Sequence, residues 1–104
     1  MIPRRFVLAN RGYKVFIAGG EKFNAARDRL GGEGPSLGMT CSDHAEIWLH
    51  SELHKTRAHL EHTFFHELMH ALLYARGIQD HDEEIVDGMA ALLHQFMLTR
   101  RGEQ

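Results

Sequence analysis

The sequence predicts an α+β fold, in which a small sheet of three to four strands packs against a long helix and a second, C-terminal helix. Three observations indicate this class. Short stretches rich in aromatic and β-branched residues occupy much of the first half of the chain. A long run without glycine or proline follows, and after one glycine a second run of helical pattern extends almost to residue 104. At 104 residues, the chain has the size of one domain, spanning residues 1–104.

The first two strands are predicted in residues 5–18. Apolar residues at positions 6–8 precede a turn pattern at residues 10–12, and apolar residues recur from Tyr13 onward. Two such segments around a tight turn are typical of a β-hairpin.

Residues 21–30 contain helix-forming residues with apolar side chains at roughly helical spacing, which indicates a short helix or an ordered loop. Glycines and a proline in residues 31–35 then predict a flexible connection. Two further strands are expected at residues 37–41 and 45–50, joined by the polar residues 42–44. The second strand is the clearer one, because apolar and polar residues alternate along it.

Two helices are predicted in the second half of the chain. Residues 55–76 form the longer one, with Gly77 at the position where a helix cap is expected. Asp80 or Asp82 can cap the next helix, which should end near the basic residues 100–101. The aromatic and methionine side chains expected in the core are Trp48, Phe64, Phe65, Met89, Phe96 and Met97.

The composition excludes several classes of partner. A formal net charge of -2 and a pI of about 6.5 provide no overall attraction to nucleic acid or to an acidic membrane surface. The first residues do not form the long apolar run of a signal peptide or a membrane span. A single cysteine, Cys41, is expected to be a small strand residue and agrees with a reducing compartment. We therefore expect a cytoplasmic protein, while its oligomeric state stays open.

The segment His66-Glu67-Leu68-Met69-His70 carries the chemistry of this chain. On a helix, residues four apart lie on the same side, so His66 and His70 can direct their imidazoles to one metal ion. Glu67 is turned about 100° from His66 and can reach a water beside the metal instead of the ion itself. This spacing predicts a zinc site with its own general base.

A catalytic zinc needs a third protein ligand and an open position for water. Glu83 is the preferred candidate because it begins a helix after a short turn, and because Asp87 lies one turn further on the same face. Asp87 could accept a hydrogen bond from a ligating histidine and fix its tautomer. Asp80, His81 and Glu84 remain alternatives for the third ligand.

These residues resemble the gluzincin metallopeptidases, whose zinc ligands are the two histidines of HExxH and a glutamate in a following ExxxD pattern. Residues 83–90 are similar to that pattern, with Glu83 as the glutamate and Asp87 as the aspartate. The chain as a whole resembles the minigluzincin-like proteins, many of them encoded by phages, and it does so most strongly over residues 63–90. The resemblance implies one zinc ion per chain, and a peptide substrate paired along the edge of the strand at residues 45–50.

The sequence thus predicts a zinc-dependent endopeptidase, active in the host cytoplasm if the chain is phage-encoded, with a peptide or protein as its substrate. The alternative from a different class is a catalytically inactive module that keeps zinc and binds a protein partner. A third possibility is a metal-free helical protein with incidental histidines, because nine histidines make chance matches more common. His59 and His62 are expected to be exposed or hydrogen-bonded polar residues. The residues left without a role, from which an oxyanion-stabilising group could come, are His44, His50, His54, Tyr74 and His94.

Overall fold

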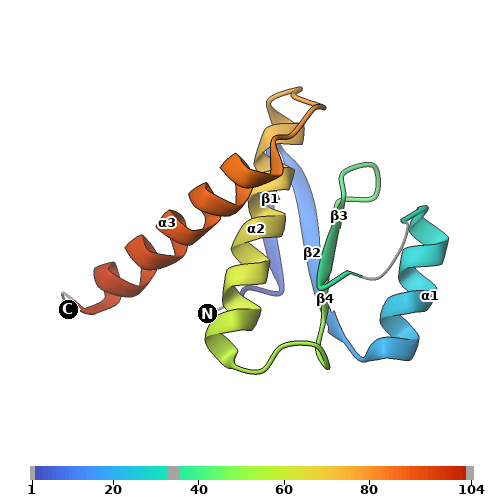
Figure 1. Ribbon diagram of the computed structural model, residues 1–104. Helices are drawn as coiled ribbons and strands as arrows, with labels where there is room; N and C mark the ends of the chain where they lie inside the picture. The colour runs from blue at the N-terminus through green and yellow to red at the C-terminus, as the bar shows by residue number, and fades with distance from the viewer. Residues whose placement is uncertain (1, 33–35, 103–104) are drawn as a thin grey trace.

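A four-stranded sheet with helices on both of its faces forms the centre of the molecule (Figure 1). The computed structural model of the chain describes residues 2–32 and 36–102, and side chains up to Arg100. In chain order the elements are β1 (Arg5–Leu8), β2 (Arg11–Ala18), α1 (Gly20–Leu30), β3 (Gly38–Cys41), β4 (Glu46–His50), α2 (Arg57–Ala75) and α3 (Glu83–Gly102). The predicted α+β class is confirmed, and part of the predicted connection, residues 33–35, lies outside the described residues.

The strand order in the sheet is β1-β2-β4-β3. β1 and β2 form the predicted hairpin, although its turn is at Ala9 and Asn10, which both have positive φ, and not at residues 10–12. β2 and β4 are parallel, and β3 pairs antiparallel with β4. β4 is therefore an interior strand with both of its edges paired, so the prediction that a peptide could bind along its edge is wrong. The crossover through α1 places the most buried strand, β4, inside the sheet, where Ile47 and Leu49 are fully buried.

Local signals define the ends of the two long helices. Thr56 caps α2 by accepting a hydrogen bond from the backbone N–H of His59 at 3.0 Å. Gly77 follows the helix with a φ of 81°, a conformation that favours glycine, as predicted. Of the two candidate caps for α3 it is Asp82 that acts, because its Oδ1 accepts from the backbone N–H groups of Glu84 and Ile85. These ends place His66 and His70 in the middle of α2, and Glu83 at the first residue of α3.

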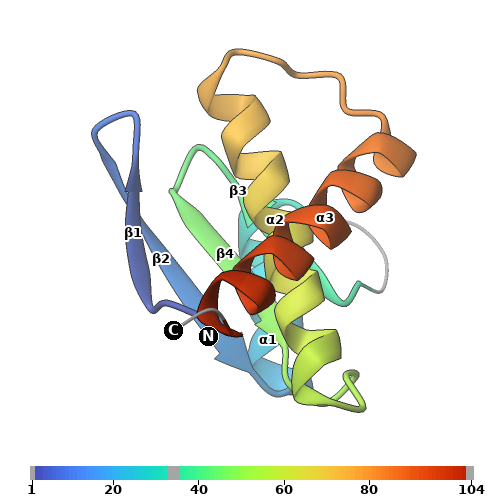
Figure 2. The same ribbon diagram turned by 90° about the vertical axis from the view of Figure 1, so that its left-hand side faces the viewer.

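The elements form layers in the order α1, sheet, α2 and α3, which Figures 1 and 2 show from two directions. The core lies between the sheet and α2, and its buried members include Tyr13, Val15, Ile47, Leu49, Phe64, Phe65 and Ala71. α1 covers the opposite face of the sheet with the fully buried Phe23. α2 packs on the sheet with one side and on α3 with another. The helix that carries His66 and His70 is therefore held in place by both the sheet and α3.

α3 is the least covered of the helices. It contacts α2 through buried Val86 and Ala90, and crosses α2 at a wide angle (Figure 2). Met89 and Phe96 are exposed, so their predicted place in the core is wrong. The helical spacing of apolar residues correctly predicted that α3 is a helix, but it could not show which of these residues another element covers. Within the described residues, no helix combines the length and apolar character needed to cross a membrane.

Candidate metal centre

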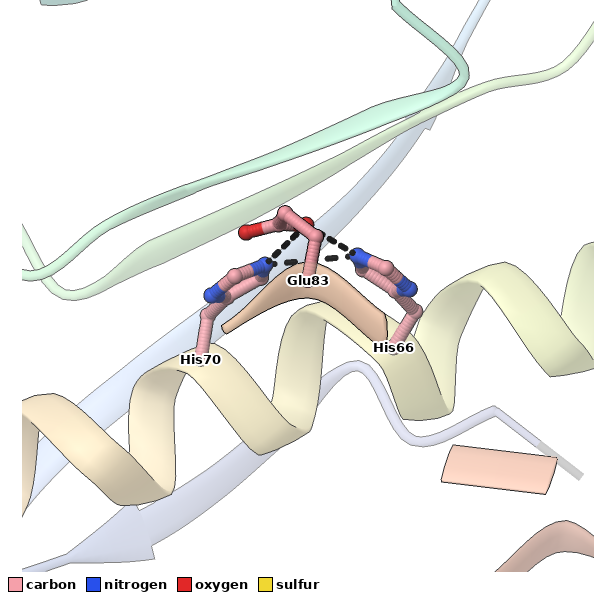
Figure 3. A group of neighbouring side chains, drawn as sticks. All are labelled: His66, His70 and Glu83. Atoms are coloured by element: carbon pink, nitrogen blue, oxygen red, sulfur yellow. Dashed lines mark hydrogen bonds and ion pairs between the residues drawn. The ribbon is translucent and has the colours of Figure 1, made fainter. Parts of the chain in front are cut away.

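His66, His70 and Glu83 point toward one another from two different helices (Figure 3). The Nε2 atoms of His66 and His70 are 3.3 Å apart. Glu83 Oε1 lies 3.2 Å from the Nε2 of His66 and 3.3 Å from that of His70. Two nitrogens and one oxygen thus form a nearly equilateral triangle, and the group can hold a metal ion. The two histidines are partly buried and the glutamate is exposed, so the fourth side of the site opens to solvent.

Asp87 orients the first of these histidines. Its Oδ1 lies 3.1 Å from His66 Nδ1 and 3.0 Å from His62 Nε2. Hydrogen bonds from His62 and His66 hold the pKa of the Asp87 carboxyl below its ordinary value. Because the Asp87 carboxylate accepts, we assign a proton to His66 Nδ1, and the other ring nitrogen, Nε2, is the one directed at the triangle. The contact expected between Asp87 and a histidine of the motif is therefore present, and His62 is a hydrogen-bonded residue.

A second chain of hydrogen bonds orients His70. His81 Nε2 lies 2.7 Å from the carbonyl oxygen of Ile78, which can only accept, so this nitrogen carries the proton. In a neutral His81 the Nδ1 then accepts, and it lies 2.6 Å from His70 Nδ1. His70 therefore donates from Nδ1 and keeps a lone pair on Nε2, facing Glu83. Burial lowers the pKa of His70, which favours this neutral form. His81 thus contacts the far nitrogen of His70 and is not part of the triangle.

Glu67 lies beside the triangle and is almost completely buried, with 8% of its surface exposed. Its Oε1 is 2.7 Å from the hydroxyl oxygen of Thr40 on β3, and that hydroxyl is also 2.9 Å from the Glu67 carbonyl oxygen. Burial raises the pKa of the Glu67 carboxyl, while the Thr40 hydrogen bond and nearby His66 act in the opposite direction. A carboxylate with a raised pKa is a better proton acceptor than an exposed one, provided that it is ionised.

A cleft of about 390 Å³ borders this centre at His66. Residues of β3, of the segment before it, of α2 and of α3 line it, namely Ser36, Leu37, Gly38, His59, His62, Thr63, His66, Glu67 and Asp87. His66 and Glu67 therefore face one cavity, in which a substrate can meet both the candidate metal and the carboxylate. Because Ser36, Leu37 and Gly38 are in its lining, the cleft lies beside the start of β3, the edge strand of the sheet.

Two residues on β3 support Glu67, and the sequence analysis did not identify either of them. Thr40 donates to Glu67 across 27 positions of sequence. Gly38 allows the strand to come close to α2, since a Cβ at this position would lie 3.1 Å from Glu67 Cγ and 3.0 Å from Thr63 Cγ2. A glycine inside a strand is a known sign of such close approach, and it was the one available signal.

The other candidates have different surroundings. Asp80 and Glu84 are exposed and do not belong to the group of three. His94 pairs with Glu61 at 3.1 Å, His54 contacts Thr63 at 2.8 Å, and the Nδ1 of His44 lies 3.2 Å from the thiol of Cys41. Tyr74 packs against the ring of His81. These contacts are structural, and none of them places a donor in the triangle.

Comparison with protein-family models, with curated proteins and with solved structures finds no match in any of the three. The geometry of the centre is therefore the basis for any statement about function.

Proposed function

We propose that this chain is a zinc-dependent endopeptidase. The observation that carries the proposal is the triangle of His66, His70 and Glu83 with the buried Glu67 beside it, where His66 and Glu67 both line one cleft. A site of two nitrogens and one oxygen with one open side is the ligand arrangement of hydrolytic zinc enzymes. The similarity to gluzincins noted in the sequence supports the same reaction.

The dimensions of the triangle fit zinc. Zinc binds nitrogen and oxygen ligands at about 2.0–2.1 Å, so tetrahedral ligands are separated by about 3.3–3.4 Å. The three separations here are 3.2, 3.3 and 3.3 Å. His66 and His70 each engage Asp87 or His81 through Nδ1, so Nε2 is the nitrogen that each would offer to a metal. Asp87 and His81, which accept from their far nitrogens, would hold both rings in this orientation.

Glu67 is the proposed general base. When bound, zinc would supply polarisation of the scissile carbonyl and a lower pKa for the attacking water. Glu67 would accept a proton from this water and then deliver it to the amine of the leaving peptide. Thr40 is a positioning residue that keeps the carboxylate turned toward the cleft.

The substrate would lie beside β3, not β4. β3 is at the end of the sheet, its partner β4 is on one side, and no strand among the described residues lies on the other. An extended peptide could add to this edge through main-chain hydrogen bonds. Since β3 also carries Gly38 and Thr40, such a peptide would pass directly over Glu67.

The test combines metal content with turnover. Wild-type protein and Glu67→Gln should each retain about one zinc per chain by elemental analysis, because Glu67 is not a ligand. Cleavage of a random peptide library, followed by mass spectrometry, should fall by about 10²–10⁴-fold in the variant, the usual contribution of a general base. Glu84→Gln, which changes an exposed neighbour of the third ligand, should cleave at the wild-type rate.

Two results would contradict the proposal. Protein that binds no zinc, even after zinc is added, would exclude the metal centre. Full zinc occupancy without cleavage of the library or of casein would favour the inactive protein-binding module over the peptidase.

A further inference from the structure

One side of α3 carries a continuous row of exposed apolar residues. Ile85, Met89, Leu92 and Phe96 are exposed to 64%, 48%, 62% and 58%, and we call them the α3 stripe. Their spacing is four, three and four residues, which is the repeat of a coiled-coil seam. Four large apolar side chains in one row exceed the scattered exposure that is normal on a protein surface. The row therefore indicates a helix that packs against another one.

The surface beside the α3 stripe is also apolar. A hollow of about 460 Å³ lies between α3, α2 and the β1–β2 hairpin, and α3 contributes Leu93 and Met97, the sequence neighbours of Leu92 and Phe96, to its lining. Its lining is almost entirely apolar, with Pro3, Phe6, Val7, Leu8, Phe64, Phe65, Leu68, Leu72, Leu93 and Met97. Figure 2 shows α3 in front of α2 with the hairpin to one side. The apolar surface of α3 therefore extends from the stripe through Leu93 and Met97 toward this hollow.

We propose that the α3 stripe is a self-association surface, on which α3 of a second copy of this chain packs antiparallel. The seam of a coiled coil is formed by the a and d positions of the heptad, and in an antiparallel pair an a residue of one helix faces a d residue of the other. Pairing Ile85 with Phe96 of the second copy also pairs Met89 with Leu92, and the twofold axis repeats both layers. The stripe is thus complementary to itself, which is the requirement for a symmetric dimer.

Charge favours the antiparallel arrangement over the parallel one. The start of α3 is acidic, with exposed Asp82, Glu83 and Glu84, and Arg100 is exposed near its other end. In the antiparallel register Arg100 falls opposite residue 81 of the second copy, next to Asp82. A parallel pair would bring the two acidic ends together, and like charges and parallel helix dipoles both oppose that. The charges therefore specify a second copy with its helix reversed.

This dimer would leave the metal centre accessible. Glu83 and Asp87 are each two residues from Ile85, which turns them about 200° around the helix from the stripe. They contact His66 on α2, while the stripe faces away from that contact. The proposal is therefore independent of the peptidase activity.

Sedimentation of the full chain over a concentration series tests the proposal. We expect a mass of twice 11.9 kDa at micromolar concentrations for the wild type. Leu92→Glu places a charge in the seam and should weaken the dimer by about thirtyfold or more. Leu98→Glu is the matched control, since Leu98 is a 48% exposed leucine of the same helix that lies off the stripe, and it should leave the dimer unchanged. Wild-type protein that stays monomeric at about 100 μM would overturn the proposal, as would equal effects of the two variants.

Cross-linking tests the orientation. In a Cys41→Ser background, the double variant Ile85→Cys, Phe96→Cys should form a covalent dimer under mild oxidation, because these positions face each other only in the antiparallel pair. The two positions are about 16 Å apart within one helix, too far for an internal disulfide. Efficient cross-linking of Ile85→Cys alone would overturn the antiparallel arrangement.

Discussion

The two long helices contribute to the same centre but are held in different ways. α2 packs against the sheet and buries Phe64 and Phe65. α3 makes its extensive contacts with α2 and exposes the α3 stripe. α2 supplies His66, Glu67 and His70, and α3 supplies Glu83 and Asp87. The candidate site therefore combines a well-anchored half with a half at the edge of the fold.

This difference has a consequence for the site. The separation of His66 and His70 depends on the pitch of one helix, so it survives any shift of the neighbours. The distance from either histidine to Glu83 depends on the packing of α3 and on the loop of residues 76–82. A bound metal would therefore tie α3 to α2 and stabilise the less covered half.

The largest expected effect is on the anchored half. Phe64→Ala should lower the free energy of unfolding by about 3–5 kcal/mol, because the ring, on α2, is buried in the core and packs against Phe6 of the hairpin. Phe96→Ala, at an exposed position of α3, should change it by about 0.5 kcal/mol or less when urea unfolding is measured with dilute protein. Equal losses in the two variants would mean that α3 is as firmly packed as α2.

The second prediction concerns the ligand on α3. Glu83→Ala should weaken zinc binding by about a hundredfold. Four-ligand sites bind zinc with a free energy of roughly 10–16 kcal/mol, and the expected loss corresponds to about one quarter of it. Glu84→Ala removes the neighbouring carboxylate, which is outside the triangle, and should leave the affinity unchanged. Competition with a chromogenic chelator measures both. If Glu84→Ala weakened zinc binding more than Glu83→Ala, the assignment of Glu83 as the third ligand would be wrong.

A smaller effect is expected from His81, between the two helices. His81→Phe keeps an aromatic ring against Tyr74 but removes the acceptor for His70 Nδ1. We expect zinc affinity to fall by about tenfold, in the lower range for residues that orient a ligand. His44→Phe changes a histidine that contacts Cys41 and does not belong to the triangle, and it serves as the control in the same competition assay. An unchanged affinity in His81→Phe would show that His70 does not depend on this contact.

The smallest effect concerns the pair of Glu61 and His94, which joins α2 to α3. Burial of the Glu61 carboxyl acts to raise its pKa, but the hydrogen bond and the charge of His94, together with other favourable interactions, outweigh it and the pKa is lowered. A lowered folded-state pKa contributes stability above the unfolded pKa of about 4.3, and this contribution is lost as pH falls through the folded value. Glu61→Gln should cost about 1 kcal/mol at pH 7, with the difference from wild type shrinking in urea unfolding as the pH falls below the unfolded pKa. A difference that grows toward acid pH would contradict this sign.

Much of the local structure follows from the sequence. The helix at residues 55–76, the glycine after it and the hairpin at residues 5–18 agree with α2, Gly77 and the pair of β1 and β2. The choice of Glu83 among nearby acidic residues agrees with the triangle in the structure, because the helix start and the four-residue spacing to Asp87 are both local patterns. The position of β4 was not predictable in this way, since the order of strands depends on which faces the helices cover.

By itself, the sequence determined those features that depend on residues only a few positions apart. His66 and His70 converge, and Glu67 turns aside from them, because the helical pitch allows nothing else. Only the tertiary structure decided that Thr40 and Gly38 of β3 hold Glu67, and that the apolar row on α3 stays uncovered. Such contacts join segments that are far apart in the chain, and they form according to which apolar faces find a partner during folding. The pattern of residues within one helix cannot specify that partner.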